Sequence, residues 1–223
     1  MEVKEALQHM LGERLKCDEP MAAHTNFRIG GSAKYFFDVR TREEAVATLH
    51  ILASNGVPWV TLGGGSNMLV ADTGFHGAII QMAMRGVQIK ETCVVAEAGV
   101  LSAYLARATA DAGLSGFTWA IGLPGTIGGA VRGNAGCYGG ETKDFFREAE
   151  VLVVRDPETS SVGVEREVWS KERCAFGYRD SALKHLVTPV LVLNATFDFP
   201  RGDIATEKQR LADILAQRKE KQP

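Results

Sequence analysis

The 223-residue chain lacks an excess of either charge, with 25 Lys and Arg against 27 Asp and Glu and a formal net charge of -2. Such a balance gives no electrostatic case for nucleic acid or a membrane surface as partners, so we expect neither. It also lacks an apolar run long enough to cross a membrane, and its charged, amphipathic beginning is not a signal peptide. We therefore expect a cytoplasmic protein, and we expect it to be a monomer.

Cysteine is scarce and scattered: Cys17, Cys93, Cys137 and Cys174 are far apart and form no C-x-x-C pair. This argues against a structural zinc site and a disulfide framework, and it fits a reducing compartment. The five histidines have no metal-ligand spacing, so we expect no metal. The G-x-G-x-x-G fingerprint and the G-x-x-x-x-G-K-[ST] loop are both missing, which excludes those two nucleotide-binding geometries.

Glycine, in contrast, is concentrated in one stretch, IGLPGTIGGAVRGNAGCYGGE, where eight of the 21 residues from 121 to 141 are glycine. Glycine costs backbone entropy on folding, so an ordered segment of this kind needs positive φ angles or a close backbone approach. Thr126 precedes a short run that can start a helical turn, where backbone N–H groups bind anions. We interpret the stretch as a diphosphate cradle with a flat ring held further along it; a glycine-rich surface loop is the alternative.

A second glycine loop, Gly63-Gly64-Gly65-Ser66-Asn67, follows directly after the apolar residues 59–62. Ser66 and Asn67 can donate to phosphate oxygens or cap local backbone groups. Taken alone, the loop is better interpreted as a plain hairpin turn. Together, the two glycine loops can clamp one diphosphate between separate units of the fold.

The remaining chain alternates between helical and strand patterns. Strands are predicted at residues 34–40, 59–62, 78–82, 87–97, 149–155, 161–168 and 189–199, the fifth and sixth joined by a turn at 156–159. Helices are predicted at residues 3–16, 102–112 and 206–219, with a helical turn at 170–174. A further helix is predicted to begin at a capping box, Thr41–Glu44, and to end at Asn55-Gly56. This order predicts an α+β protein with two packed lobes and a cofactor between them.

Five motifs then agree, in order, with one family: HTNFRIGG (24–31), LGGGSNMLV (62–70), GLPGTIGGAVRGNAGCYGGE (122–141), FGYRDS (176–181) and KQP (221–223). Together they resemble the UDP-N-acetylenolpyruvoylglucosamine reductases over nearly the whole chain. The resemblance implies a two-lobed FAD-binding fold of the vanillyl-alcohol oxidase/PCMH type. It also implies NADPH-dependent reduction of UDP-N-acetylglucosamine enolpyruvate to UDP-N-acetylmuramate for peptidoglycan.

By this resemblance, residues 1–20 form an N-terminal helix, 21–82 and 83–202 the FAD-binding lobes, and 203–223 a helix leading toward a C-terminal substrate domain. The expected FAD-binding residues are Gly63, Gly64, Gly65, Ser66, Asn67, Gly122, Pro124, Gly125, Thr126, Gly128, Gly129 and Ala135. Arg132 and Gly133 depart locally from the family pattern. No His or Cys spacing indicates a covalent flavin link, so we expect non-covalent FAD.

The resemblance assigns Arg179 to the substrate carboxylate, because a guanidinium grips a carboxylate with two parallel hydrogen bonds and stays charged. The alternative is a surface arginine in an ion pair. Tyr178 and Asn134 are expected to contact substrate, with core packing as the alternative for Tyr178. In the family a serine donates the proton and a glutamate assists, both beyond KQP. We expect Ser181 and Glu141 to play neither role, and hence a chain that binds FAD with impaired turnover. A non-catalytic FAD-binding fragment and another flavin oxidoreductase of this fold are the other hypotheses.

Overall fold

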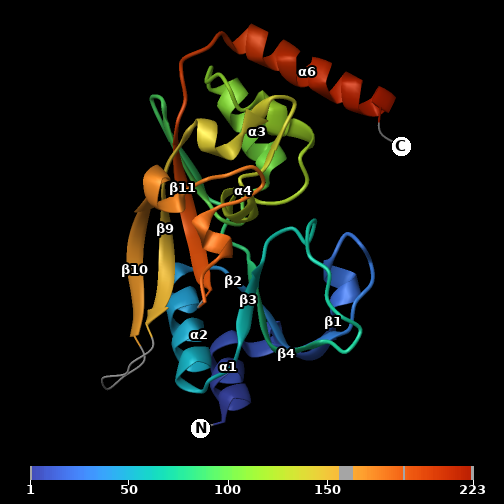
Figure 1. Ribbon diagram of the computed structural model, residues 1–223, viewed down its shortest axis with the longest axis vertical. Coiled ribbons are helices and arrows are strands. Elements are labelled where there is room, and N and C mark those ends of the chain that lie inside the picture. Colours follow the sequence, from blue (N-terminus) through green and yellow to red (C-terminus); the bar gives the residue numbers. More distant parts are fainter. Residues whose placement is uncertain (1, 156–162, 188, 222–223) are drawn as a thin grey trace.

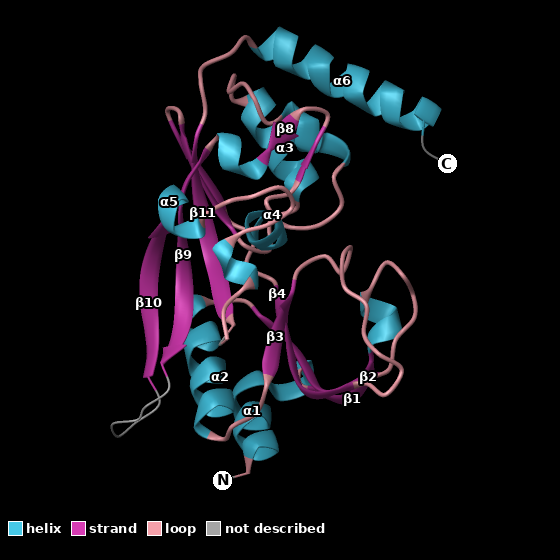
Figure 2. Ribbon diagram, viewed as in Figure 1, coloured by secondary structure: helices cyan, strands magenta, loops and turns pink. Residues whose placement is uncertain are grey.

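The computed structural model describes residues 2–155, 163–187 and 189–221, and contains two principal β-sheets with helices packed around them (Figures 1 and 2). The predicted turn at 156–159, the start of the 161–168 strand and the last two residues of the KQP motif lie outside the described residues. Within the described part, no helix is long and apolar enough to cross a membrane, and no group of three His, Cys, Asp or Glu residues can hold a metal ion.

The first sheet has the strand order β1-β2-β4-β3 and is mixed. Its strands are β1 (Lys16–Pro20), β2 (Ser32–Val39), β3 (Trp59–Leu62) and β4 (Phe75–Met82). β1 runs antiparallel to β2, whereas β2 and β3 both run parallel to β4. Strands β2 and β3 lie parallel on either side of β4, so the chain must cross over between them, and helix α2 (Arg42–Ser54) forms that crossover.

Helix α2 begins and ends where the sequence predicts. The Thr41 hydroxyl accepts the Glu44 N–H at 3.1 Å, while the Glu44 carboxylate accepts the Arg40 N–H at 2.8 Å. Gly56 follows the helix with φ of 62° and donates its N–H to the Ala53 carbonyl. These contacts satisfy backbone groups that the ends of a helix leave without partners.

The second sheet is antiparallel, with the strand order β10-β9-β11-β6-β5. Its strands are β5 (Val87–Lys90), β6 (Cys93–Glu97), β9 (Phe146–Arg155), β10 (Gly163–Ser170) and β11 (Val190–Asp198). A small hairpin, β7 (Gly136–Cys137) and β8 (Gly140–Glu141), stands apart from both sheets. The main hydrophobic core contains residues of both sheets, among them Phe37, Ile80, Val151 and Phe197.

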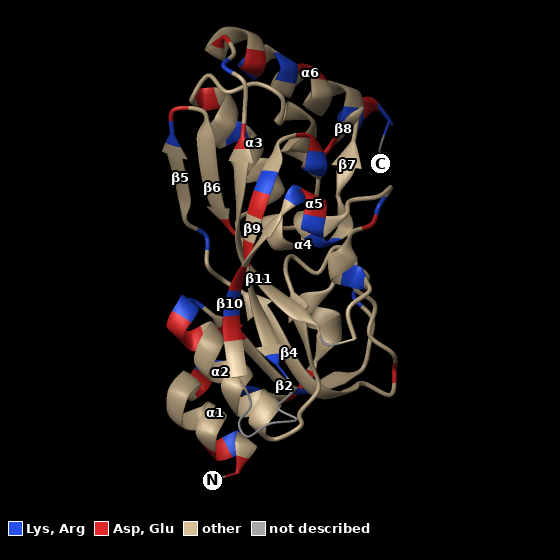
Figure 3. Cartoon of the chain, turned by 60° about the vertical axis from the view of Figure 1, so that its left-hand side comes forward, with Lys and Arg blue, Asp and Glu red and all other residues tan. Residues whose placement is uncertain are grey.

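The other helices are α1 (Val3–Leu11), α3 (Ser102–Asp111), α4 (Ile127–Gly133), α5 (Lys171–Cys174) and α6 (Ile204–Lys221). Helices α4 and α5 pack on the second sheet, α1 packs on α2, and α6 packs on α3 and η3 (Thr118–Gly122). Short 3₁₀ turns join them: η1 (Gly12–Arg14), η2 (Met21–His24), η3 (Thr118–Gly122), η4 (Thr142–Asp144) and η5 (Ala182–Lys184). Figure 1 places α4 where β3 approaches β11, and α6 beside α3. Lys, Arg, Asp and Glu are concentrated on the outer elements α1, α2, β10 and α6 (Figure 3).

Two predicted elements were wrong in extent. The 87–97 strand is a hairpin that reverses at Glu91-Thr92, with Glu91 at φ of 55°, and the turn contains no Gly, Asn or Pro to signal it. The 3–16 helix stops at Leu11 because Gly12 adopts φ of 58°, and the short polar strand β1 follows at Lys16. On α6, Leu211 is buried against the fold, whereas Ile204 and Leu215 are 47% and 40% exposed.

Candidate active site

The two glycine loops of the sequence meet in space. Loop 63–67 leaves the end of β3, and a Cβ built on Gly64 would lie 3.2 Å from the Gly125 Cα atom. A Cβ on Gly63 would lie 2.3 Å from the Thr126 hydroxyl oxygen. The Ser66 hydroxyl donates to the Pro124 carbonyl at 3.3 Å. The fold therefore brings together segments about 60 residues apart, and glycine is what permits the close approach.

The HTNFRIGG motif supports the first of these loops. The Asn26 N–H donates to the Gly65 carbonyl at 3.0 Å. A Cβ on Gly65, whose φ is 68°, would lie 2.1 Å from the His24 carbonyl oxygen. The His24 ring is in turn fixed by the Glu19 carboxylate at 2.8 Å and by the Phe36 ring at 4.0 Å. The motif thus shapes the backbone of the glycine loop from outside.

Some backbone amides at the junction are hydrogen-bonded within the protein, and others are not. The Ile127 and Gly128 N–H groups donate to the Val100 and Ala98 carbonyls at 2.8 and 2.9 Å. These two amides at the start of α4 are therefore used by the fold and are not available to an anion. In loop 63–67, by contrast, no hydrogen bond from the amides of residues 64–67 is found among the described residues. Those amides are the main donors that the junction offers to an anion.

Two buried hydroxyl groups at the junction have no partner among the described residues: Thr126 Oγ1 and Ser102 Oγ. The Ser102 N–H donates to the Gly125 carbonyl at 3.1 Å, so both residues border the same glycine-rich segment. A buried polar atom without a hydrogen bond costs stability and calls for a specific explanation. A ligand with acceptor oxygens at this junction would explain the Thr126 hydroxyl, which lines a cavity there, whereas Ser102 does not line that cavity.

A cavity of about 70 Å³ opens beside these groups. Gly63, Thr126, Gly128, Gly129 and Arg132 contribute polar or backbone surface to its wall. The rest of the wall consists of Thr61, Leu62, Met82, Ala98, Leu183, Val190 and Val192. The cavity is smaller than a whole cofactor needs, so its polar and apolar sides suit only part of a ligand that has a phosphate portion and a flat apolar portion. Sequence reasoning missed Val190 and Val192, since their apolar run is indistinguishable from an ordinary core strand.

Gly122 and Ala135 lie differently from the rest of the expected cofactor set. A Cβ on Gly122 would lie 2.1 Å from Arg218 Nε, so this glycine makes room for a side chain of α6. Arg218 also lies over the Tyr138 ring, 5.8 Å from its centroid. Ala135 uses its backbone within the fold, because its carbonyl accepts the Thr142 N–H at 2.9 Å and the Thr142 hydroxyl at 2.8 Å. Both placements favour structural roles.

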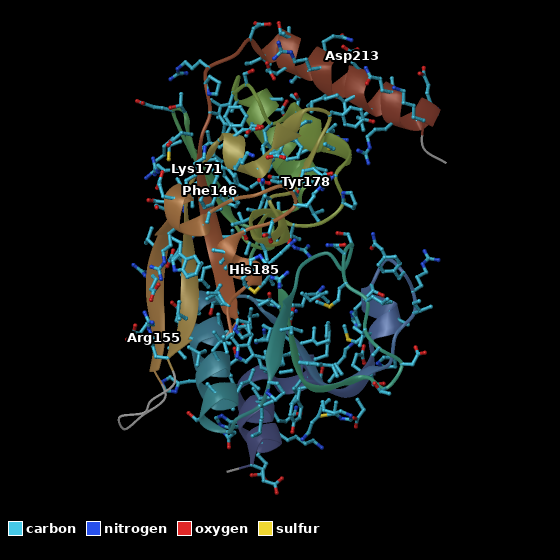
Figure 4. The ribbon with its side chains drawn as sticks, in the orientation of Figure 1. Phe146, Arg155, Lys171, Tyr178, His185 and Asp213 are labelled. Atoms are coloured by element: carbon cyan, nitrogen blue, oxygen red, sulfur yellow. The ribbon has the colours of Figure 1, made fainter. Side chains whose placement is uncertain are left out.

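Arg179 lies at the tip of a tight turn beside α4. Gly177 and Asp180 exchange backbone hydrogen bonds of 3.0 and 3.3 Å, which leaves Tyr178 and Arg179 at the tip, with Arg179 at φ of 54°. Tyr178, labelled in Figure 4, is 84% exposed, so it is not a core residue. Arg179 is also exposed, and it has no ion pair within 4.0 Å among the described residues. Its charge is therefore available to a ligand.

The charged groups around this turn are fixed. The Lys143 ammonium, the Asn134 amide and the Arg179 charge together hold the pKa of the Glu141 carboxyl below its usual range. Burial raises the pKa of the Cys137 thiol, although the nearby Arg218 and Arg179 charges oppose this. Near neutral pH, Glu141 is therefore ionised and has no proton to donate, while Cys137 is a neutral thiol and hence a poor nucleophile.

Asn134 is fully buried at the end of α4 in a left-handed conformation, with φ of 40°. Its Nδ2 group donates to the Gly177 carbonyl at 2.7 Å and to Glu141 Oε2 at 3.1 Å. Its Oδ1 atom accepts the Lys143 N–H at 3.0 Å. A side chain occupied in this way has no free group for substrate, so the structure favours a positioning role over the substrate contact expected from the motif.

Comparison with known proteins agrees with this geometry. A family profile described as an FAD binding domain matches residues 33–159. Alkyldihydroxyacetonephosphate synthase shares the fold, with a TM-score of 0.59 at 17% identity over 90% of this chain and 41% of that one. The fold and its glycine cradle place the chain among the FAD-binding proteins of the two-lobed vanillyl-alcohol oxidase/PCMH type, within the α+β class.

Sequence relatives narrow the class. UDP-N-acetylenolpyruvoylglucosamine reductase from Chloroflexus aurantiacus is 41% identical over 92% of this chain and 69% of its own length. The reductase from Chloroflexus aggregans is 38% identical over 94% of this chain and 70% of its own length. A crystal structure of the Thermus caldophilus reductase matches with a TM-score of 0.75 and 29% identity over 94% of this chain and 71% of that one. The chain belongs to the UDP-N-acetylenolpyruvoylglucosamine reductase family, whose members are flavoprotein oxidoreductases.

Proposed function

We propose that this chain holds FAD between loop 63–67 and α4, and that it uses NADPH to reduce UDP-N-acetylglucosamine enolpyruvate to UDP-N-acetylmuramate. The observation that carries the proposal is the junction itself: the two glycine loops lie close together, and neither the amides of residues 64–67 nor the buried Thr126 hydroxyl has a partner among the described residues. These residues fit FAD, whose diphosphate needs donors and whose ring needs an apolar wall. When bound, FAD supplies hydride transfer.

The chain offers several kinds of group to the cofactor. The free amides of residues 64–67 and the Thr126 hydroxyl are suited to diphosphate oxygens. Arg132 lines the same cavity, and no ion pair of its side chain is found within the described residues. Its charge therefore adds attraction for the anionic part of the cofactor. Leu62, Val190 and Val192 provide apolar surface on the opposite side.

Arg179 is suited to the reacting end of the substrate. Reduction of an enolpyruvyl double bond places negative charge on the carbon that bears the carboxylate. An arginine beside that carboxylate stabilises this charge more strongly in the transition state than in the substrate. The exposed position of Arg179, without an acidic partner within 4.0 Å in the described residues, supports this role.

Neither Ser181 nor Glu141, the polar residues near the turn, is suited to donate a proton to the developing carbanion. The Ser181 hydroxyl is buried and donates to the Arg132 carbonyl at 2.7 Å. The Glu141 carboxylate is ionised and bonded to Lys143 and Asn134. Both placements support the expectation that these residues are not the acid.

The proposal is tested by two half-reactions of the FAD-loaded chain under anaerobic conditions. NADPH is expected to bleach the flavin absorbance, and UDP-N-acetylglucosamine enolpyruvate is expected to restore it with formation of the lactyl ether. The rate of restoration measures directly how fast this chain turns over. Bleaching by NADPH without any restoration by the enolpyruvyl substrate would contradict the proposed substrate while leaving the cofactor in place.

The Thr126 hydroxyl gives a prediction with opposite effects on the apo and loaded protein. Thr126→Val keeps the shape of the side chain and removes a buried polar atom that has no partner. The apo protein should therefore melt at the same or a higher temperature, while FAD affinity falls about tenfold through loss of a hydrogen bond. Thermal melting and fluorescence titration with FAD measure the two effects. Equal weakening of apo stability and affinity would show that the hydroxyl serves the fold instead.

A further inference from the structure

We infer that Asn134 is a positioning residue that fixes the Arg179 turn relative to the cofactor cradle. The inference rests on the proposed function, since it concerns how Arg179 is presented to the substrate. It assigns a role that the sequence motif alone does not give. Two observations support it: the side-chain hydrogen bonds of Asn134, and its position at one end of α4.

The amide of Asn134 joins three separate segments. One Nδ2 hydrogen reaches the Gly177 carbonyl at 2.7 Å, and the other reaches Glu141 Oε2 at 3.1 Å. The Oδ1 atom accepts the Lys143 N–H at 3.0 Å. An asparagine side chain has two donor hydrogens and one carbonyl oxygen, so its donors are fully used. Full burial removes water as a competing partner and makes each bond costly to lose.

The backbone at this position also selects asparagine. The residue ends α4 in the left-handed region, with φ of 40° and ψ of 57°. Glycine and asparagine are the residues that adopt this conformation most readily at the end of a helix. Glycine would satisfy the backbone alone, whereas asparagine adds the three side-chain bonds. The side chain can therefore be removed without strain in the backbone.

The turn is attached to α4 on both sides of Arg179. Before the tip, Gly177 is held by Asn134; after it, the Ser181 hydroxyl donates to the Arg132 carbonyl at 2.7 Å. The Lys184 ammonium also contacts the Arg179 carbonyl. Both α4 anchors lie in the last turn of the helix and at its end.

The opposite end of the same helix borders the cradle, since Thr126, Gly128 and Gly129 line the cavity. At seven residues, α4 is about 10 Å long. A helix this short, with an internally hydrogen-bonded backbone, does not bend appreciably, so its two ends stay at a fixed separation. Asn134 thus sets the distance between the cofactor cradle and the arginine that faces the substrate.

The test compares Asn134→Gly with a matched control, Asn55→Gly. Asn55 also follows a helix and bonds a backbone carbonyl, that of Ile51 at 2.7 Å, but it lies at the end of α2. Hydrogen exchange of a peptide covering residues 176–181 is measured on the FAD-loaded chain. Asn134→Gly should speed exchange of the Gly177 and Asp180 amides about tenfold, and Asn55→Gly should leave it unchanged. Unchanged exchange in Asn134→Gly would overturn the inference.

A double-mutant cycle with Arg179→Ala then tests whether the effect passes through Arg179. Alone, Asn134→Gly should slow single-turnover flavin reoxidation by the substrate about tenfold; in the Arg179→Ala background it should add no further loss. Equal losses in both backgrounds would show a general structural defect and contradict the inference. If the flavin of the wild-type chain is never reoxidised by substrate, the proposed function is contradicted. The hydrogen-exchange comparison alone then tests whether Asn134 fixes the turn.

Discussion

Arg179→Ala is expected to slow substrate-dependent flavin reoxidation by about 10²–10³-fold while leaving FAD binding unchanged. The magnitude is that of removing one fixed electrostatic group from a site where charge develops in the transition state. Because Arg179 has no ion pair within 4.0 Å among the described residues, its removal leaves no buried charge without a partner. The loss should therefore appear in rate and substrate affinity and not in the melting temperature. Stopped-flow spectroscopy under single-turnover conditions measures the rate.

Arg179→Lys is the informative control for this variant. Lysine keeps the charge but lacks the planar pair of donors that matches a carboxylate. Its rate should fall between those of the wild type and Arg179→Ala, with weaker substrate binding seen in the perturbed flavin spectrum. If Arg179→Ala reoxidised at the wild-type rate, Arg179 would be an ordinary surface arginine, and the proposed role of the 177–180 turn would be withdrawn.

Gly64→Val is expected to abolish retention of FAD by closing the junction between the two glycine loops. A Cβ at this position already lies 3.2 Å from the Gly125 Cα, a backbone atom that cannot rotate away as a side chain can. The branched side chain of valine pushes the loops apart and displaces the amides of residues 64–67. We expect FAD affinity to fall at least about 100-fold, the result of losing several charge-assisted hydrogen bonds together. Equilibrium dialysis and the ratio of flavin to protein absorbance measure it.

The matched control for Gly64→Val is Gly163→Val, where a new Cβ meets no atom of the described residues within 4 Å. Gly163 begins β10 in the second sheet and lies outside the candidate site. The control should retain FAD and melt like the wild type. Retention of stoichiometric FAD by Gly64→Val would mean that the cofactor does not depend on contact between the loops, which is the basis of the candidate site.

Much of the fold could be predicted because its signals are local. Thr41 and Glu44 mark the start of α2, and the glycine loop directly after residues 59–62 marks the end of β3. The 87–97 hairpin was missed because its turn residues, Glu91 and Thr92, carry no turn signal. Strand β1 was missed because an edge strand of charged and polar residues has no apolar alternation to detect.

Only the part of the candidate site that the glycine loops themselves form could be predicted from the sequence. That Gly63 and Gly64 lie against Thr126 and Gly125 agrees with the predicted clamp of two loops. The surroundings of Gly122 and Asn134 depend on Arg218 and Gly177, which come from segments distant in sequence. Both positions belong to the glycine-rich motif. The motif does not distinguish whether a ligand or another part of the protein occupies the space beside them.

The central claim is that the two glycine loops form a cradle for FAD, and the most direct test is the visible absorption of the purified 223-residue chain. The chain is mixed with FAD, freed of unbound flavin, and its spectrum is recorded next to its circular dichroism. We predict a bound-flavin spectrum near one FAD per chain, with the flavin released on denaturation because no covalent bond holds it. A folded but colourless protein would contradict the account.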